Sequence, residues 1–536
     1  MNNNSLVRLL VVVPPITNPE SDGDTIPDRP DFESRRLVSP IEPLTVISDL
    51  EARGFDVDFI DLGAQENLRY ENLAAKSTEY QPDVAIIIQS ILTFATAMDW
   101  DGGRAFETIR KNCPDVITIL TGNYATNYPG KAVENGVCDY SIRGEVEFAV
   151  GELVDAIRNN SGYENIAGLS YRDQSGALHT GEDYPSVDLS GLPLPAYHVL
   201  DEAHKAAYKE ILEKGKIRYP EKSAHYRDIM LSRSCVLRCS FCSVAPLRGP
   251  RQKYRRKPMD LIIGEIEQAL DQGVKEIHFF DDLFASSEQE ILSFTEALSR
   301  RGLKFPWYVA QGMPLWPLSK NVLAAMKETG MYRIICPLES GNDRVLRDVC
   351  GKIHSKITHH HNVIRWSKEL DLEIIGMFVI GMHGESRSEI METIQFAEDH
   401  PEIDYSVFSI ATPLVGTRLM RNIMRDDGLD DPDKINRVIK RTVGLYESTQ
   451  FKSYEMGVIR TFDWDRINFS TPERRVKYAR MTGMTLEELE SARQDSKNVF
   501  YNFFPDYDGP KSFSELVDHP NMFIDLIPVI PEKVYS

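Results

Sequence analysis

Short apolar runs alternate with longer amphipathic segments along most of this chain. In the first 150 or so residues the apolar runs are 7–13, 57–62, 84–89, 117–121 and 140–142, and helix-length segments lie at 43–53, 69–80, 100–112 and 130–135. Apolar runs of this length without polar alternation are typical of parallel strands that are buried on both faces. The pattern therefore predicts an open, doubly wound, Rossmann-like α/β domain that binds ligands at the C-terminal ends of its strands.

The same rhythm resumes at residue 228. Strands are predicted at 228–233, 276–280, 305–309, 333–337, 373–380 and 405–411, with helices at 259–272, 288–300, 320–329, 357–370 and 385–399. Six repeats are too few for a closed eight-stranded barrel. A proline-punctuated stretch, 189–197, marks a junction, and the end of the chain is mostly helical. We expect four regions: 1–160, a connecting segment 161–227, 228–420 and a helical domain 421–536.

Composition narrows the class of protein. The chain has 536 residues, 42% of them hydrophobic, and a net charge of −20. An acidic chain of this kind argues against nonspecific nucleic-acid binding, which needs clustered Lys and Arg. No apolar run approaches the ~20 residues that span a bilayer, and the start lacks the pattern of a signal peptide. Scattered cysteines fit a reducing compartment, so we expect a cytoplasmic protein with no membrane partner.

The most informative motif is a cysteine loop, in which Cys235, Cys239 and Cys242 have the spacing C-x3-C-x2-C. A cubane cluster normally takes four cysteine ligands, so three in one loop suggest a [4Fe-4S] cluster with one iron open to another ligand. A structural zinc site is the alternative, but closed zinc sites take four Cys or His ligands, usually as two pairs. With Phe241 before the last cysteine, the loop resembles the signature of radical S-adenosylmethionine (SAM) enzymes, in which the amino and carboxylate groups of SAM chelate the open iron.

Further motifs follow the later strands in the order expected for that family. The resemblance implies a partial (β/α)6 barrel and assigns SAM contacts to Phe241, to residues at the ends of three strands and to two residues within the strand 373–380 that backs the adenine. These residues are Asp281, Asp282, Glu339, Ser340, Thr412, Gly376 and Phe378. The two aspartates occupy the position that often reads Gly-Gly-Glu and holds the SAM ammonium. Which of them does so stays open, and Asp282 as a helix N-cap is the plain alternative.

The first domain resembles the cobalamin-binding module of B12-dependent radical SAM proteins. The resemblance assigns cobalamin contacts to residues that follow the first, third, fourth and fifth strands, namely Pro15, Gln89, Ser90, Thr93, Gly122, Asn123, Tyr124, Gly144 and Glu145. No histidine precedes His179, so the usual histidine ligand of cobalt is absent from this region. A flavodoxin-like domain that binds nothing, or another nucleotide, is the rival interpretation.

The resemblance as a whole implies a cobalamin-dependent radical SAM methyltransferase. Such an enzyme uses a 5′-deoxyadenosyl radical and methylcobalamin to methylate an unactivated carbon of a small molecule, with electrons from a flavodoxin or ferredoxin. A cyclase, rearrangement or oxidation enzyme with the same cofactors is the alternative, and a cofactor-binding sensor is a weaker one. The basic stretch 248–257 is either a solvated loop or an anion site. The run 359–361 of three histidines reads as a polar helix face, since consecutive helical residues cannot share one ion.

Overall fold

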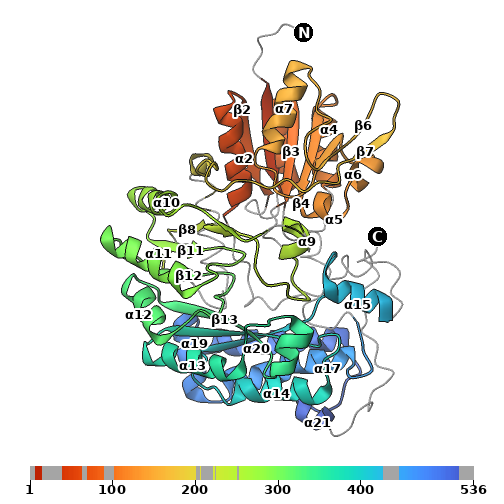
Figure 1. Ribbon diagram of the computed structural model, residues 1–536. Coiled ribbons are helices and arrows are strands. Elements are labelled where there is room, and N and C mark those ends of the chain that lie inside the picture. Colours follow the sequence, from red (N-terminus) through yellow and green to blue (C-terminus); the bar gives the residue numbers. More distant parts are fainter. Residues whose placement is uncertain are drawn as a thin grey trace. The chain divides into compact units, whose positions relative to one another are not determined.

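The computed structural model describes residues 7–14, 39–62, 69–89, 102–200, 204, 206, 221–223, 225–249, 251, 253–426 and 446–517 (Figure 1). These residues divide into two compact units. The first takes the residues up to 206 together with 244–251, and the second takes 221–243 and everything from 253 on. No helix in the described part of the chain is long and apolar enough to cross a membrane.

The first unit is a sheet with the strand order β2-β1-β3-β4-β5-β6-β7. The first five strands are parallel, whereas β6 and β7 are antiparallel additions. Their bounds are Arg8–Val13 (β1), Asp56–Asp61 (β2), Val84–Gln89 (β3), Ile117–Gly122 (β4), Tyr140–Ile142 (β5), Leu169–Arg172 (β6) and Leu178–Thr180 (β7). The order 2-1-3-4-5 is that of a flavodoxin-like doubly wound sheet.

Helices cover both faces of this sheet, which explains why its strands are apolar throughout. Leu9 and Val11 of β1 pack in one core, and Leu10 and Val12 pack in the other. Helices α2 (Ile41–Ala52) and α7 (Ala149–Asn159) contribute to the first core, and α3 (Arg69–Tyr80) and α4 (Gly103–Asn112) to the second. The shorter α5 (Asn123–Asn127), α6 (Lys131–Glu134), α9 (Val244–Arg248) and the 3-10 turn η4 (Tyr197–Val199) complete the unit.

The second unit contains six parallel strands that follow one another in chain order. They pair as β8-β11-β12 and β13-β14-β15, and a bridge between Trp307 and Met331 joins the two sets. Their bounds are Tyr226–Ile229 (β8), Glu276–Phe279 (β11), Trp307–Val309 (β12), Arg333–Glu339 (β13), Glu373–Ile380 (β14) and Tyr405–Ile410 (β15). The intervening helices are α10 (Met259–Asp271), α11 (Glu288–Arg300), α12 (Lys320–Glu328), α13 (Ile357–Glu369) and α14 (Arg387–Glu398). This is the predicted arrangement of six βα repeats.

Three departures from regular βα repeats matter below. A small ribbon pairs β9 (Ser232–Arg233) with β10 (Arg255–Arg256) around the cysteine loop. A π-helix, η5 (Val345–Cys350), follows β13 in place of an α-helical start. A second π-helical segment, η6 (Ile459–Asp463), lies among the C-terminal helices. Within the described residues these helices are α15 (Arg418–Asp426), α17 (Ser453–Val458), α18 (Trp464–Phe469), α19 (Pro472–Thr482), α20 (Leu486–Phe503) and α21 (Phe513–Val517).

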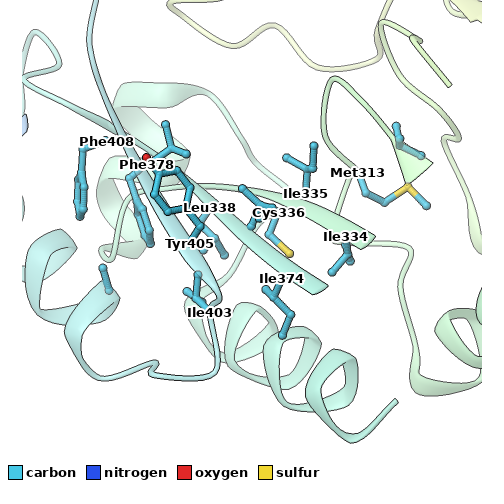
Figure 2. Packing of buried hydrophobic residues seen from close by; sticks show 14 of the residues in the cluster. Met313, Ile334, Ile335, Cys336, Leu338, Ile374, Phe378, Ile403, Tyr405 and Phe408 are labelled. Carbon is cyan, nitrogen blue, oxygen red and sulfur yellow. The ribbon is translucent and has the colours of Figure 1, made fainter. Parts of the chain in front are cut away.

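The hydrophobic core of the second unit runs without interruption from the strands into these C-terminal helices. Figure 2 shows part of it, with Phe378 and Phe408 side by side and Tyr405 nearby. The Phe378 and Phe408 rings stack with centroids 5.1 Å apart. Trp464 of α18 donates its indole N–H to the Tyr405 hydroxyl at 3.1 Å. The C-terminal helices therefore stabilise the strands directly.

Asn468 on α18 closes the open edge of this sheet. β15 is the last strand in its order and pairs with β14 on one side. On the other side the Asn468 Oδ1 accepts the Ser406 N–H at 2.8 Å, and its Nδ2 donates to the Ser406 carbonyl at 2.9 Å. One side chain thus satisfies both backbone groups of an edge residue, as a further strand would.

Replacing Asn468 with alanine should lower the free energy of unfolding of the second unit by about 2–4 kcal/mol, because a buried backbone donor and acceptor lose their partners. Urea unfolding followed by tryptophan fluorescence measures this, since residues 307, 316, 366 and 464 of the five tryptophans lie in this unit. Asn498 on α20 is exposed and accepts from Gln494 on the surface, so Asn498→Ala is the control and should stay within about 0.5 kcal/mol. Equal effects of the two substitutions would contradict the edge-closing role.

Candidate functional site

The cysteine loop leaves β9 and is held from two directions by backbone hydrogen bonds. The Ser240 N–H donates to the Cys350 carbonyl at 2.8 Å, and the Leu419 N–H donates to the Ser240 carbonyl at 2.8 Å. Gly351, with φ +83°, lies so close to the backbone of the cysteine loop that an added Cβ would be 3.1 Å from the Arg238 carbonyl oxygen. The loop therefore rests on the segment after η5 and on the start of α15.

The three predicted ligands, Cys235, Cys239 and Cys242, take part in no disulfide within the described part of the chain, and each is of intermediate exposure. Burial raises the pKa of Cys235 to about 12 and raises that of Cys239. Within the described residues no group of His, Cys, Asp or Glu is already gathered to hold a metal ion. Metal binding would have to displace the thiol protons, so uptake of iron is coupled to deprotonation of these cysteines.

The two aspartates after β11 have different partners. Asp281 is buried, and its Oδ1 accepts the N–H groups of Leu231 and Ser232 and the Ser232 hydroxyl, at 2.6–2.8 Å. Burial raises its pKa to about 6. Asp282 is partly exposed, and its Oδ2 accepts the N–H of Ser234, one residue before the first cysteine, at 2.8 Å. Asp281 Oδ1 thus joins the segment after β11 to β9, while its buried Oδ2 has no hydrogen-bond partner within the described residues. Asp282 is the more exposed of the two, and which aspartate meets the SAM ammonium stays a prediction.

Helix capping is not the role of Asp282. The N-cap of α11 is Ser287, whose side chain accepts the N–H of Glu290. The alternative interpretation of Asp282 as an N-cap is therefore wrong, and its assignment to SAM stays a prediction.

Glu339 ends β13 in a strained conformation. Its φ is +60°, the left-handed region that costs a non-glycine residue about 1–3 kcal/mol, and the register shifts by a bulge between Pro337 and Glu339. Its carboxylate lies 2.7 Å from the ammonium of Lys352, and both side chains are 8% exposed. Ser340 is fully buried, and its hydroxyl bonds Thr393 at 3.0 Å, so its contact with SAM stays a prediction.

Gly376 and Phe378, the two β14 residues assigned to SAM, share a face of the strand that packs in the core. Phe378 is fully buried against Phe408 (Figure 2). An added Cβ on Gly376 would meet Leu338 and Phe378 at 3.2 Å, so this glycine makes room for core side chains. The assignment of Gly376 and Phe378 to SAM stays a prediction, and Phe378 is the member of the pair whose side chain is committed to the core. Thr412 follows β15 and is partly exposed, and Phe241 packs at the edge of the same core.

Glu385, after β14, is a buried acid to which no role was assigned from the sequence. It is fully buried, and its Oε2 accepts the Met382 N–H at 3.0 Å, while its Oε1 has no hydrogen-bond partner. Burial raises its pKa to about 8. Because the folded protein favours the protonated acid, its contribution to stability is complete below the ordinary value of 4.5 and is lost as pH rises toward 8.

Glu385→Gln should therefore stabilise the protein at pH 8, on the order of 2 kcal/mol, and change it little at pH 4.5. Urea unfolding of the iron-free protein at the two pH values measures the difference. Glu389, four residues on, is the control of opposite sign, because its bond with Arg344 lowers its pKa to about 2. Glu389→Gln should destabilise the protein at pH 8. A Glu385→Gln effect that does not vary with pH would rule out the proposed linkage.

The basic stretch and the histidine run have internal partners. Arg248 is buried beside Glu42 and Glu145, and Lys257 lies 2.6 Å from Glu265. Two cations of the stretch 248–257 are thus paired with acidic side chains of the protein, which weakens the interpretation of this stretch as an anion site. In the histidine run, His359 bonds the Leu315 carbonyl and His361 bonds His400, whereas His360 is buried. The three rings do not share an ion, as predicted, although the expected polar face is wrong for His360.

Of the residues assigned to cobalamin, Pro15, Ser90 and Thr93 lie outside the described residues. Gln89 and Gly122 end β3 and β4 opposite each other, and an added Cβ on Gly122, where φ is +91°, would lie 1.7 Å from the Gln89 carbonyl oxygen. The Gln89 side chain accepts the Tyr124 N–H at 2.8 Å. Gly122 is therefore required by the contact between the two strands.

The remaining members of that set also have structural contacts. Asn123 and Tyr124 are buried at the start of α5, and the Gly144 N–H donates to the Thr126 hydroxyl at 2.9 Å. Glu145 is fully buried, accepts the Val187 N–H at 2.9 Å and lies 3.8 Å from Arg248. Their assignment to cobalamin stays a prediction, and Glu145 is the member most committed to the protein itself.

Known proteins resemble this chain over most of its length. The radical SAM superfamily matches residues 229–397. An uncharacterized methyltransferase of Pyrococcus horikoshii is 28% identical over 72% of this chain and 79% of its own. Cytidylyl-2-hydroxyethylphosphonate methyltransferase of Streptomyces wedmorensis is 25% identical over 82% of this chain and 89% of its own.

One solved structure supports the predicted architecture. The cobalamin-dependent S-adenosylmethionine radical enzyme OxsB, with aqua-cobalamin and S-adenosylmethionine bound, matches 96% of this chain and 75% of its own. The TM-score is 0.63 at 15% sequence identity. At that identity the likeness concerns the fold, and it confirms the prediction of a doubly wound domain followed by a partial barrel.

Proposed function

We propose that this chain, which is a radical SAM enzyme, uses cobalamin as a second cofactor and methylates an unactivated carbon of a small molecule. The observation that carries the proposal is the cysteine loop at the strand ends of a domain matched by the radical SAM superfamily. The names of the two methyltransferase relatives support methyl transfer as the reaction, and the cobalamin in OxsB supports cobalamin as the second cofactor.

The residues of the second unit suit a [4Fe-4S] cluster and SAM. Three thiols from one loop match the soft ligands that iron–sulfur clusters prefer, and they leave one iron for SAM. When bound, the cluster supplies the electron that cleaves SAM. In this proposal Cys235, Cys239 and Cys242 hold the cluster, Asp282 accepts hydrogen bonds from the SAM ammonium, and Glu339 accepts them from the ribose hydroxyls. A small redox protein of the flavodoxin or ferredoxin class would deliver the electron.

The first unit suits a large planar ligand at the C-terminal edge of its sheet. Gln89 and Gly122 lie opposite each other there, and Asn123 and Gly144 follow β4 and β5. Doubly wound sheets bind ligands at this edge. When bound, cobalamin would supply the methyl group. No histidine occurs before His179, so residues 1–160, the proposed cobalamin domain, cannot offer an imidazole to cobalt.

Anaerobic reconstitution with iron, sulfide and hydroxocobalamin, followed by desalting and metal analysis, tests the proposal. The expected result is about four irons and one cobalt per chain. A protein that takes up iron but no cobalt would exclude cobalamin as its second cofactor and would still be a radical SAM enzyme. Product mass then decides the reaction, because methylation adds one carbon and two hydrogens, whereas cyclisation, rearrangement or oxidation adds no carbon.

A further inference from the structure

We infer that Lys352 is the positioning residue that holds Glu339 in the conformation that binds SAM. The inference rests on the proposed function and adds a residue to it. Lys352 belongs to none of the motifs that identify the site in the sequence. It is 6% exposed, and its ammonium lies 2.7 Å from the Glu339 carboxylate and 2.8 Å from the Pro337 carbonyl oxygen.

Both contacts act on the strained end of β13. Glu339 has a φ of +60°, and the strand is bulged between Pro337 and Glu339. Such a conformation persists where the surroundings fix it. Lys352 binds a backbone carbonyl on one side of the bulge and the carboxylate on the other, so it fixes the turn and the direction of the Glu339 side chain together.

The segment that carries Lys352 is built to bring it beside the cysteine loop. It follows the π-helix η5, a rare element found often at functional sites. The Cys350 carbonyl accepts the Ser240 N–H of the loop at 2.8 Å, and Gly351 lets the two backbones approach closely. One cation therefore joins the proposed SAM residue, Glu339, to the segment on which the proposed cluster loop rests.

This arrangement predicts a defect in SAM binding that is separate from the cluster. Lys352→Met in the reconstituted holoenzyme should weaken SAM binding about tenfold or more, because Glu339 loses the partner that orients it. Iron content should stay at about four per chain. Lys352→Arg, which keeps the charge, should bind SAM more tightly than the methionine variant does. Lys356→Met, at an exposed lysine four residues on, is the control and should bind SAM as the wild type does.

Equilibrium dialysis of SAM, with iron counted on the same samples, gives both quantities. A Lys352→Met affinity within about twofold of the wild type would overturn the inference, and so would iron loss in proportion to lost affinity. If Lys352→Met does not fold, Lys352→Gln keeps a donor for the Pro337 carbonyl without the charge and should show the same tenfold loss; wild-type affinity would overturn the inference. A wild-type enzyme that takes up no iron or binds no SAM would instead overturn the proposed function itself.

Discussion

Alanine in place of Cys235, Cys239 or Cys242 should abolish cluster assembly and SAM cleavage together. Each thiolate supplies one of three protein ligands, and the two left behind cannot hold a cubane that normally takes four. Iron should fall from about four per chain to near zero after anaerobic reconstitution and desalting, with the cluster absorption lost. Reduced protein should then release neither methionine nor 5′-deoxyadenosine. Cleavage of SAM by any of the three variants would contradict the central assignment.

Two other cysteines test whether this loss is specific. Cys336 lies in the core of β13 (Figure 2), and Cys336→Ala should cost stability but no iron. Cys350 is the sharper control, because its carbonyl bonds the cysteine loop while its side chain is fully buried. Cys350→Ala should keep about four irons and bind SAM. Loss of iron in that variant would indicate that Cys350 is a fourth cysteine ligand. The cluster would then have no iron with an open coordination position for SAM.

The fold could be predicted from the sequence because its strands and helices have clear periods. The helix predicted at 69–80 is α3, and the strand predicted at 373–380 is β14. The order of the strands within each sheet could not be predicted from the sequence, but the alternation of strands and helices was sufficient to predict the α/β fold class. The π-helix at 345–350 was missed because its apolar positions look like those of any short helix. The burial of α17 and α18 depends on contacts with distant strands, which no local period reports.

The candidate site was predictable where one segment carries the chemistry. The cysteine loop is such a segment. The direction of a side chain from β14 was not predictable, because the strand has no polar residue from Ile374 to Ile380 and so shows no alternation to tell one face from the other. In the structure Phe378 is buried, whereas Met377 and Val379 on the opposite face are partly exposed. Lys352 was missed because its partner, Glu339, is known only once β13 and the segment after η5 are placed together.

Arg248 is the clearest case of a partner that the sequence could not reveal. It was read as part of a basic stretch, and Glu145 was read as a cobalamin contact, yet the two lie 3.8 Å apart. The Arg248 guanidinium also bonds Glu42 at 3.0 Å, and its side chain is 0% exposed. Two acidic residues that are far apart in the sequence thus share one buried cation. This cluster fixes α2, the turn after β5 and α9 to one another within the first unit.

Arg248→Met should therefore destabilise the first unit by about 3–5 kcal/mol, because it removes the shared cation of two buried carboxylates. Hydrogen exchange followed by mass spectrometry should show faster exchange in peptides that cover 41–52 and 140–159. Arg251→Met, at an exposed position of the same loop, is the matched control and should change stability by less than about 0.5 kcal/mol. Adding Glu42→Gln and Glu145→Gln to Arg248→Met should recover much of the loss, because no buried charge then lacks its partner. Equal exchange in the Arg248 and Arg251 variants would show that the three charges do not hold these elements together.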